Sequence, residues 1–480
     1  MCVSATHSQA MVTYMRSSEA NEILVLGIVN NDVTNDTRVK RVAASAMAAG
    51  FSSQVLGFTS GEKTQIVKMG EVNVTRVPVP LGIPNKANSG VNLIGVELLV
   101  RLKRKAISVL RKILIRIVDL LLKLPVVRGL LRRGSVNQFI DRTVRKVISR
   151  DFTTHYGDEI LRIKPDLIHA HDFHMIGVAV EAAEKLRATG HSVKVVYDAH
   201  EFVAGLDHLE KPVREKWLNH EEAYINRVDA VICVSDLQAS RLQERYQLNL
   251  QPEVVLNCPI LDTTLSGSST IRDDVGHSGT LLVYHGKASR ARGLEELVGA
   301  LEFLSPDTHV ALVVDTSLPF VKDLEILAET INKGMGIKHK RLHLLPYVDA
   351  SDLPQYLSSA DIAVIPLRET GNHEVAMPNK LFEAIQAKLP VLTSERQALS
   401  EYVIDKEIGM VFVDGDSRGL AQTVEMMLAA KSHFVERYDE AFLKECSWDA
   451  QSQRLINFYC QVLGIDPIPV RSISLDEIRL

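Results

Sequence analysis

At 480 residues the chain is too long for one ordinary hydrophobic core, so we expect at least two domains. Its 46% hydrophobic and 24% charged residues are typical of a soluble globular protein, and the net charge of −4 does not indicate a nucleic-acid partner. The five cysteines include no Cys-x-x-Cys pair, which argues against a zinc site or a disulfide framework and favours a reducing compartment.

The chain is expected to begin its first domain with a βαβ unit. The apolar run 22–28 predicts a buried strand, residues 38–49 a helix and residues 53–58 a second strand. This unit has no GxGxxG loop, which argues against a dinucleotide-linked enzyme. Asp36 and Arg38 lie where the loop enters the helix, so they either face a ligand or serve as a helix cap and a solvated first-turn charge.

A strongly basic segment follows at residues 91–150. Residues 101–150 contain fifteen Lys or Arg and only two acidic residues, and apolar residues recur there at helical spacing. The pattern predicts a basic amphipathic helix whose residues 98–124 can lie on an anionic membrane surface. The alternative is a helical insertion that packs its apolar face on the domain. Charges are too frequent for a membrane span, and no aromatic residues are interleaved to stack on nucleic-acid bases.

Histidines gather in and just after the next predicted strand, residues 167–170. His169, His171 and His174 fall within six residues, a density that raises the question of a metal site. We expect a strand and a loop to point these side chains in different directions, and no further ligand cluster is evident. The sequence therefore predicts that no metal is bound.

A second polar group follows the strand predicted at 193–197. His200 and Glu201 come just after that strand, where they either line a pocket or form a loop that caps the next helix. Strands expected at 230–234 and 253–256 complete this half of the chain.

Residues 261–279 are rich in Thr, Ser, Gly and Asp and predict a linker. A strand at 281–284 then leads into the loop 285–293, which is short, basic and bounded by glycine. Lys287 and Arg292 in this loop can neutralise a diphosphate, and the alternative is a solvated charged turn. Further strands are expected at 309–314 and 341–345, and a helix at 353–360.

The segment 361–394 carries the clearest sign of a site. It predicts a buried strand at 362–367, a polar loop at 368–377, a helix that begins at Pro378 and a strand that begins at Val391. A loop at the carboxyl end of a parallel strand is where open α/β sheets bind ligands, and the start of a helix suits a phosphate. Glu383 lies within reach of such a ligand, although a solvated helix carboxylate is the alternative.

The sequence HEVAMPNKLFEAIQAKLPVLTS in this segment resembles the nucleotide-sugar-binding motif of glycosyltransferase family four. The segments PDLIHAHDFH and DAHE and the basic loop 285–293 resemble other segments of that family and occur in the same order. The resemblance implies a GT-B fold, that is, an α/β protein of two Rossmann-like domains facing a cleft. It implies a retaining transfer from a nucleotide-sugar donor that needs no metal or other cofactor.

The resemblance also implies roles for individual residues. Glu383 matches the second Glu of the family's Glu-x7-Glu motif and would bind the donor ribose, whereas Glu374 stands one residue before the position of the first. The residues that match catalytic positions are His171, with His169 as the alternative match, Lys287 and Arg292. Those that match donor-binding positions are Gly286, Asn372, His373, Glu374, Pro378, Asn379, Lys380, Leu381 and Glu383. Those expected at the acceptor are Asp36, Arg38, His169, His200 and Glu201.

In the expected mechanism, Lys287, Arg292 and the start of the helix at Pro378 stabilise the departing diphosphate, which accepts the proton of the acceptor. His171 orients the acceptor or shields the reacting carbon. Asn372 and His373 meet the donor sugar or its phosphates.

We expect six parts in the chain. These are a flexible leader without a secretory signal at 1–20, an acceptor domain at 21–260 with its insertion at about 91–150, the linker 261–279, a donor domain at 280–445, a helix at 446–463 that returns to the first domain, and a loose tail at 464–480. Trp448 and Tyr459 are expected to pack the returning helix on the first domain.

The predicted function is transfer of a sugar to a sugar or lipid-linked acceptor in the synthesis of a glycan, cell-surface polysaccharide or glycolipid. The predicted location is the cytoplasm, with peripheral attachment to the inner face of the membrane as an extension of that prediction. Two alternatives are a nucleotide-sugar epimerase on the same fold and a non-catalytic scaffold that kept the fold.

Overall fold

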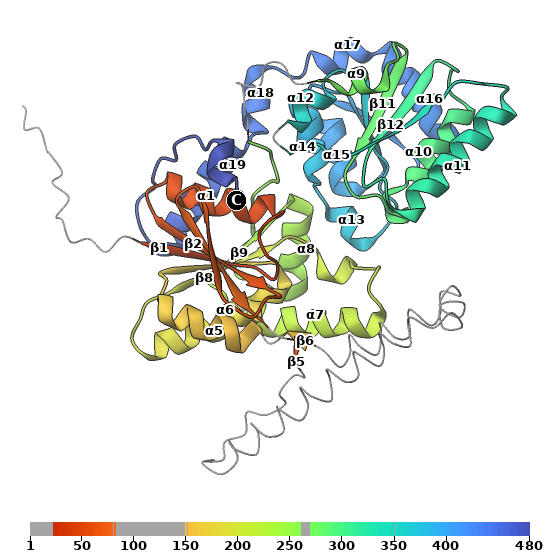
Figure 1. Cartoon of the computed structure of the whole chain (residues 1–480). Coiled ribbons are helices and arrows are strands. Elements are labelled where there is room, and N and C mark those ends of the chain that lie inside the picture. Colours follow the sequence, from red (N-terminus) through yellow and green to blue (C-terminus); the bar gives the residue numbers. More distant parts are fainter. Residues whose placement is uncertain (1–22, 80, 83–148, 151, 261–268, 351) are drawn as a thin grey trace, which may run out of the picture. The chain divides into compact units, whose positions relative to one another are not determined.

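The computed structural model describes residues 23–79, 81–82, 149–150, 152–260, 269–350 and 352–480 (Figure 1). The predicted leader and the basic segment 98–124 lie outside these ranges, as does most of the predicted insertion. Internal contacts divide the chain into a larger unit, residues 1–59, 63–77 and 156–480, and a smaller unit, residues 60–62 and 78–155. In the smaller unit, a short antiparallel pair joins β5 (Leu81–Gly82) to β6 (Ser149–Arg150).

The larger unit contains two sheets, and the first has eight strands in the order β10-β9-β8-β7-β1-β2-β4-β3. The pairs β10–β9, β9–β8, β8–β7, β7–β1 and β1–β2 are parallel, as expected for buried apolar strands. The strands are β1 (Leu24–Ile28), β2 (Ser52–Thr59), β3 (Gln65–Met69), β4 (Val72–Pro78), β7 (Leu167–His171), β8 (Lys194–Ala199), β9 (Ala230–Cys233) and β10 (Glu253–Val254).

The antiparallel hairpin of β3 and β4 was not predicted. Its tight turn contains Gly70, whose φ is 53°, a backbone conformation that glycine adopts without strain. The helices of this half are α1 (Thr37–Ala48), α5 (Phe152–Ile163), α6 (Phe173–Ala188), η1 (Val203–Gly205), α7 (Lys211–Ile225) and α8 (Asp236–Tyr246). Asp36 caps α1 by accepting a hydrogen bond from the backbone N–H of Val39.

The second sheet has six strands in the order β13-β12-β11-β14-β15-β16, and all neighbouring pairs are parallel. In chain order this is the doubly wound pattern 3-2-1-4-5-6, which reverses between β11 and β14. The strands are β11 (Thr280–His285), β12 (Thr308–Val313), β13 (Leu342–Leu345), β14 (Ile362–Ile365), β15 (Val391–Ser394) and β16 (Gly409–Phe412).

Helices cover both faces of the second sheet. Alternate residues of β11 enter two different apolar clusters, Leu281 and Val283 on one face and Leu282 and Tyr284 on the other. The helices are α9 (Ile271–Val275), η2 (Arg290–Arg292), α10 (Leu294–Gly299), η3 (Ala300–Glu302), α11 (Pro319–Gly334), α12 (Leu353–Leu357), α13 (Gly371–Val375), α14 (Asn379–Gln386), α15 (Gln397–Asp405), α16 (Ser417–Ala429), α17 (Lys431–Val435) and α18 (Glu440–Glu445).

Two details of the segment 361–394 differ from the prediction. The polar loop contains the single helical turn α13, because the side chain of Thr370 accepts a hydrogen bond from the N–H of His373 and caps it. Pro378 is the residue before α14 rather than its first helical residue. Its ψ of 146° is extended, so the helical backbone begins at Asn379.

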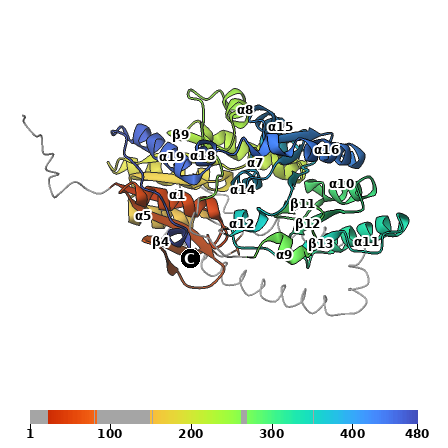
Figure 2. The same ribbon diagram turned by 90° about the horizontal axis from the view of Figure 1, so that it is seen from above.

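The last long helix, α19 (Trp448–Leu463), packs against α1, as Figures 1 and 2 both show. The indole Nε1–H of Trp448 donates to Ser45 Oγ at 3.0 Å, and the hydroxyl of Tyr459 lies 2.5 Å from His169 Nδ1. Both aromatic rings are fully buried in the core of the first sheet. The predicted return of the C-terminal helix to the first sheet is therefore confirmed.

The predicted loose tail is wrong. Ile473 is 3% exposed in the core of the first sheet, and Ile468, Val470 and Leu475 pack against the same cluster. The segment ends in η4 (Leu475–Ile478), which contacts α1. The apolar residues of the segment 464–480 are spaced too irregularly to predict a helix or a strand. Their side chains can nevertheless be buried without belonging to a helix or a strand. Among the described helices, none is long and apolar enough to cross a membrane.

Candidate active site

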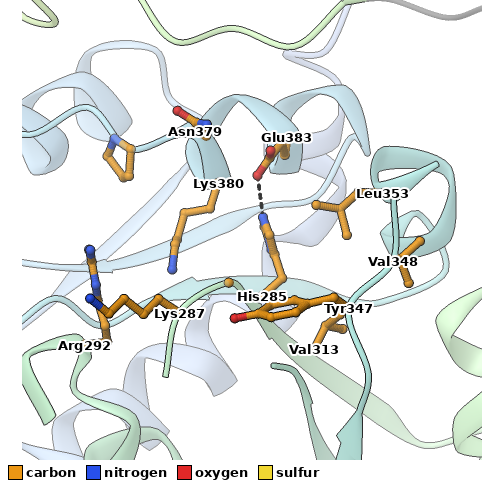
Figure 3. Close-up of a pocket in the computed structure, with 12 residues that line it drawn as sticks. His285, Lys287, Arg292, Val313, Tyr347, Val348, Leu353, Asn379, Lys380 and Glu383 are labelled. Carbon is orange, nitrogen blue, oxygen red and sulfur yellow. Dashed lines mark hydrogen bonds and ion pairs between the residues drawn. The ribbon is translucent and has the colours of Figure 1, made fainter. Parts of the chain in front are cut away.

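A pocket of about 390 Å³ lies at the carboxyl ends of β11, β12 and β13 and at the start of α14 (Figure 3). This edge includes the point between β11 and β14 at which the strand order reverses, where doubly wound sheets bind ligands. The lining residues are His285, Gly286, Lys287, Arg292, Val313, Tyr347, Val348, Leu353, Pro378, Asn379, Lys380 and Glu383.

One side of the pocket is cationic. Lys287 and Arg292 come from the loop after β11, and Lys380 comes from the first turn of α14 (Figure 3). The Lys380 ammonium is buried without a hydrogen-bond partner and lies 3.8 Å from the centroid of the Tyr284 ring. Burial, and then the charge of Arg292, hold the pKa of Lys380 well below its ordinary value. Three cations with one unpartnered ammonium favour a ligand with several negative charges.

Gly286 allows the chain to turn into this pocket. Its φ is 105°, in the region that side chains rarely adopt, and a Cβ there would lie 3.5 Å from Lys380 Nζ. The glycine therefore brings the backbone close to the ammonium of Lys380.

The opposite side of the pocket has a hydrogen-bond acceptor. Glu383 receives a hydrogen bond from His285 Nε2 at 2.7 Å, and its side chain is 14% exposed. Although burial works against the charged form, this hydrogen bond and the electrostatic interaction with His285 keep the pKa of Glu383 below its ordinary value. Glu383 is therefore not a solvated helix carboxylate. It is an ionised acceptor that can receive hydrogen bonds from the hydroxyl groups of a ligand.

The remaining wall is apolar and aromatic. Val313, Val348 and Leu353 line it together with Tyr347, which is 56% exposed. A wall of this kind suits the flat face of a ring such as a nucleobase. Val313, Val348 and Leu353 were not predicted as site residues, and neither was His285. The signal available for His285, Val313 and Tyr347 was their place at or just after the carboxyl end of a strand.

Four residues predicted at the donor do not line this pocket. The side chain of Leu381 is fully buried in the core, and Asn372 lies in α13. His373 Nδ1 bonds to the carbonyl oxygen of Arg368 at 2.7 Å. Glu374 pairs with the guanidinium of Arg396 at 2.6 Å. The carboxylate of Glu374 is thus already engaged within the protein.

A second group of polar side chains lies at the carboxyl edge of the first sheet. His169 and His171 occupy the same face of β7, with ring centroids 4.2 Å apart, because alternate strand residues point to the same side. The expectation that these two histidines point in different directions is therefore wrong. Asp198 of β8 lies beside both, and His200 follows the end of that strand.

Arg38 holds Asp198 from α1. Its Nε and Nη2 donate to the two carboxylate oxygens of Asp198, both at 2.8 Å, and Nη1 donates to Val255 O at 3.0 Å. Arg38 is 5% exposed, so the alternative of a solvated first-turn charge does not hold. Asp36, in contrast, caps the helix, which is one of the two roles that the sequence suggested for it. An acceptor role for either residue stays a prediction.

Two sets of side chains have the spacing of metal ligands among the described residues. They are His169, His171 and Asp198, and also His277, Asp307 and His309. In the first set both nitrogens of His169 have hydrogen-bond partners, and Arg38 occupies both oxygens of Asp198. In the second set His277 Nδ1 accepts a hydrogen bond from Gly279 N, which places the imidazole proton on the nitrogen facing Asp307. We assign a metal to neither set, and a metal-free reaction stays a prediction.

Comparison with known families identifies both halves of the chain. A family model described as Glycosyl transferases group 1 matches residues 279–430, and one described as Glycosyltransferase Family 4 matches residues 124–260. Together these matches cover more than half of the chain. No curated protein matches it.

Several solved structures share the fold at low sequence identity. Sucrose-phosphate synthase from Thermosynechococcus elongatus is 16% identical with a TM-score of 0.64, over 92% of this chain and 100% of that one. The Anabaena protein HepE in complex with UDP-glucose is 14% identical with a TM-score of 0.59, over the same shares. The lipopolysaccharide glycosyltransferase WaaG is 15% identical with a TM-score of 0.55, again over 92% and 100%.

The two family matches, the two parallel α/β sheets and the similarity to these structures agree with one another. The chain belongs to the family-four type of glycosyltransferases, has the GT-B fold and is a glycosyltransferase enzyme.

Proposed function

We propose that the protein transfers a sugar from a nucleoside-diphosphate sugar to an acceptor hydroxyl with retention of anomeric configuration. The observation that carries this proposal is the pocket with three cations on one side and the ionised Glu383 on the other. A nucleoside diphosphate has the matching order of groups, since its phosphates are anionic, its ribose offers hydroxyls and its base is flat. The HepE structure with UDP-glucose supports this ligand class by analogy.

In the proposed reaction, the bond between the anomeric carbon and the diphosphate oxygen breaks and a bond to the acceptor oxygen forms on the same face of the sugar. Negative charge grows on the departing diphosphate. Lys287, Arg292 and Lys380, which line the pocket, stabilise that charge. The acceptor proton goes to the departing phosphate, so no protein side chain must act as a strong base and no metal is required.

The finer parts of the proposal concern the acceptor and the location. We place the reaction in the cytoplasm, in the synthesis of a glycan, cell-surface polysaccharide or glycolipid with a sugar or lipid-linked acceptor. The basic sequence 98–124 supports peripheral attachment to an anionic membrane surface, and WaaG is a lipopolysaccharide enzyme of the same fold. Sedimentation with phosphatidylglycerol vesicles tests this part, because neutral phosphatidylcholine vesicles should leave the protein in the supernatant.

The donor site is tested by a thermal-shift screen with UDP, GDP and ADP, followed by their sugars. A ligand at a hundred times its dissociation constant adds about 2.7 kcal/mol of stability. We expect one nucleotide to raise the melting temperature of the wild type and to have no such effect on Glu383→Ala. The control Glu425→Ala, which changes an exposed glutamate of α16, should keep the shift. If no nucleotide shifts the wild type, the donor-site proposal fails and the scaffold alternative gains support. Release of free sugar without transfer to any of the added acceptors would favour the epimerase alternative.

A further inference from the structure

We infer that His200, rather than His171, is the histidine that the first sheet presents to a bound substrate, and that Asp198 is the residue that positions it. His169, His171, Arg38 and Tyr459 then act through Asp198 or His200. This inference rests on the proposed function, since it concerns the acceptor side of the same reaction.

Exposure separates the three histidines. The side chain of His169 is 0% exposed, that of His171 is 1% exposed and that of His200 is 20% exposed. The second ring nitrogen of His171, Nε2, is buried without a partner and faces β1, where a Cβ on Gly27 would lie 3.6 Å from it. His171 therefore points into the sheet and not toward solvent, although its position matches the family motif.

The hydrogen bonds fix which nitrogen of His200 is free. Because Arg38 donates to both oxygens of Asp198, this carboxylate is ionised and fixed in orientation by two hydrogen bonds, and it accepts from His200 Nε2 at 3.2 Å. The same nitrogen lies 3.3 Å from His171 Nδ1. The Nε2–H of His200 is thus directed into the protein. Its Nδ1 has no partner among the described residues and remains to meet a substrate oxygen.

The same network extends to the C-terminal helix. Asp198 Oδ2 also accepts from His169 Nε2 at 3.1 Å, which leaves His169 Nδ1 as the acceptor for the hydroxyl of Tyr459 at 2.5 Å. The donor and acceptor roles along this series are consistent from Tyr459 to Asp198. The α19 helix therefore helps to hold the carboxylate that positions His200.

The charges around His200 agree with this arrangement. The groups that face it are Asp198, Asp172, Asp36, Glu201, Arg38, His169 and His171. Although burial opposes protonation, the charge of Asp198 raises the pKa of His200 above its ordinary value. Burial, and then the neighbouring His169, lower the pKa of His171 to about 3. A protonated His200 would offer Nδ1–H to a sugar or phosphate oxygen.

Accessibility gives the first test. Diethylpyrocarbonate modifies exposed imidazole, so mass spectrometry of the treated full-length protein should find His200 modified and His169 and His171 unmodified, with the exposed His433 as the positive control. Modification of His171 with protection of His200 would overturn the inference.

Hydrolysis of the nucleotide sugar found in the screen, with water as the acceptor, gives the second test. We expect His200→Gln, which keeps a group near Nε2 but loses Nδ1, to lower kcat about tenfold with an unchanged KM for the donor. Asp198→Asn should have a similar effect and should also lower the pKa of His200 in an imidazole NMR titration. Tyr459→Phe, which removes one hydroxyl, is the variant to use if Asp198→Asn does not fold, and His433→Asn is the matched control.

The outcomes separate this inference from the proposed function. All these variants should keep the thermal shift with the nucleotide, because none of the changed residues lines the donor pocket. If the wild type shows no shift, the proposed function fails. If the shift is present but His200→Gln hydrolyses the donor at the wild-type rate, or if neither Asp198→Asn nor Tyr459→Phe changes the titration of His200, the inference alone fails.

Discussion

Replacing Lys380 by methionine should stabilise the ligand-free protein and weaken its binding of nucleotide. The lysine is 9% exposed and its ammonium has no hydrogen-bond partner, so its charge is desolvated without compensation by an anion. The ring of Tyr284, 3.8 Å away, returns part of that cost, about 0.5–2 kcal/mol. Methionine has a similar length and no charge. Replacing uncompensated buried charge by an apolar side chain should therefore raise the free energy of unfolding by about 1–2 kcal/mol.

The stabilisation should depend on pH in a defined direction. The pKa of Lys380 is lowered in the folded protein, so the unfolded chain binds the proton more tightly between that lowered pKa and the ordinary value of 10.5. Wild-type stability therefore rises with pH through this window, whereas Lys380→Met lacks this contribution. The advantage of the variant should be largest below the lowered pKa of Lys380 and should shrink as the pH rises from there toward 10.5.

Differential scanning calorimetry and nucleotide titration measure the two effects. A gain of 1 kcal/mol raises the Tm of a domain of this size by about 2–4 °C. Loss of a charge-assisted hydrogen bond should weaken nucleotide binding roughly tenfold to a hundredfold. Lys322→Met, on the exposed side of α11, should change neither quantity. A lower Tm for ligand-free Lys380→Met, or unchanged nucleotide affinity, would refute the reasoning.

Three further perturbations test the scaffold around the site. Trp448→Ala should lower the free energy of unfolding by about 3–5 kcal/mol in urea titrations, because the ring is fully buried, and a loss below about 1 kcal/mol would contradict its packing role. Gly293→Ala should destabilise the protein and weaken nucleotide binding, since its Cβ would lie 1.9 Å from Pro366 O, whereas Gly276→Ala, with the same sign of φ and nothing within 4 Å, should cost only about 1–2 kcal/mol. Burial and neighbouring imidazoles lower the pKa of His309 from 6.5 to about 4, so the Tm of the wild type should fall as the pH drops from 6.5 toward 4. The Tm of His309→Gln should fall less over the same pH range, because the variant lacks this imidazole.

The buried parallel strands were predictable because each is a short apolar run bounded by polar residues. The strands β1 and β14 fall within such runs, and β7 and β11 extend only one residue beyond theirs at one or both ends. The hairpin of β3 and β4 was not predicted. It lies toward one edge of its sheet, and Gln65, Ile66 and Lys68 of β3 are exposed, so its pattern resembles that of a polar loop. Edge strands need less burial than central ones, and their sequence signal is weaker for that reason.

The donor pocket was partly predictable because its charged residues lie in the loop after β11 or in α14, the helix that follows β14 and its polar loop. Lys287 and Arg292 follow β11, while Lys380 and Glu383 follow β14 almost a hundred residues later. The sheet order brings the two segments together, since β11 and β14 are hydrogen-bonded neighbours. Periodicity alone does not reveal that adjacency. The resemblance to the family motifs indicated that the segments after β11 and β14 belong to one site. The role of His285 as the partner of Glu383 could be seen only once the order of the strands was known.

On the acceptor side, the histidine that matches the family motif is not the histidine that is accessible in the structure. His169 and His171 are two residues apart, and β7 extends through His171 instead of ending at Ala170 as predicted, so both side chains lie on one buried face of the strand. A histidine within such a strand is surrounded by protein groups. Asp198 and Tyr459 bond the two nitrogens of His169, whereas His171 meets His200 through Nδ1 and its Nε2 has no partner. His200 differs because it lies one residue beyond the end of β8. A motif therefore marks the neighbourhood of a site, but the position of a residue relative to the end of its strand decides whether its side chain can reach a substrate.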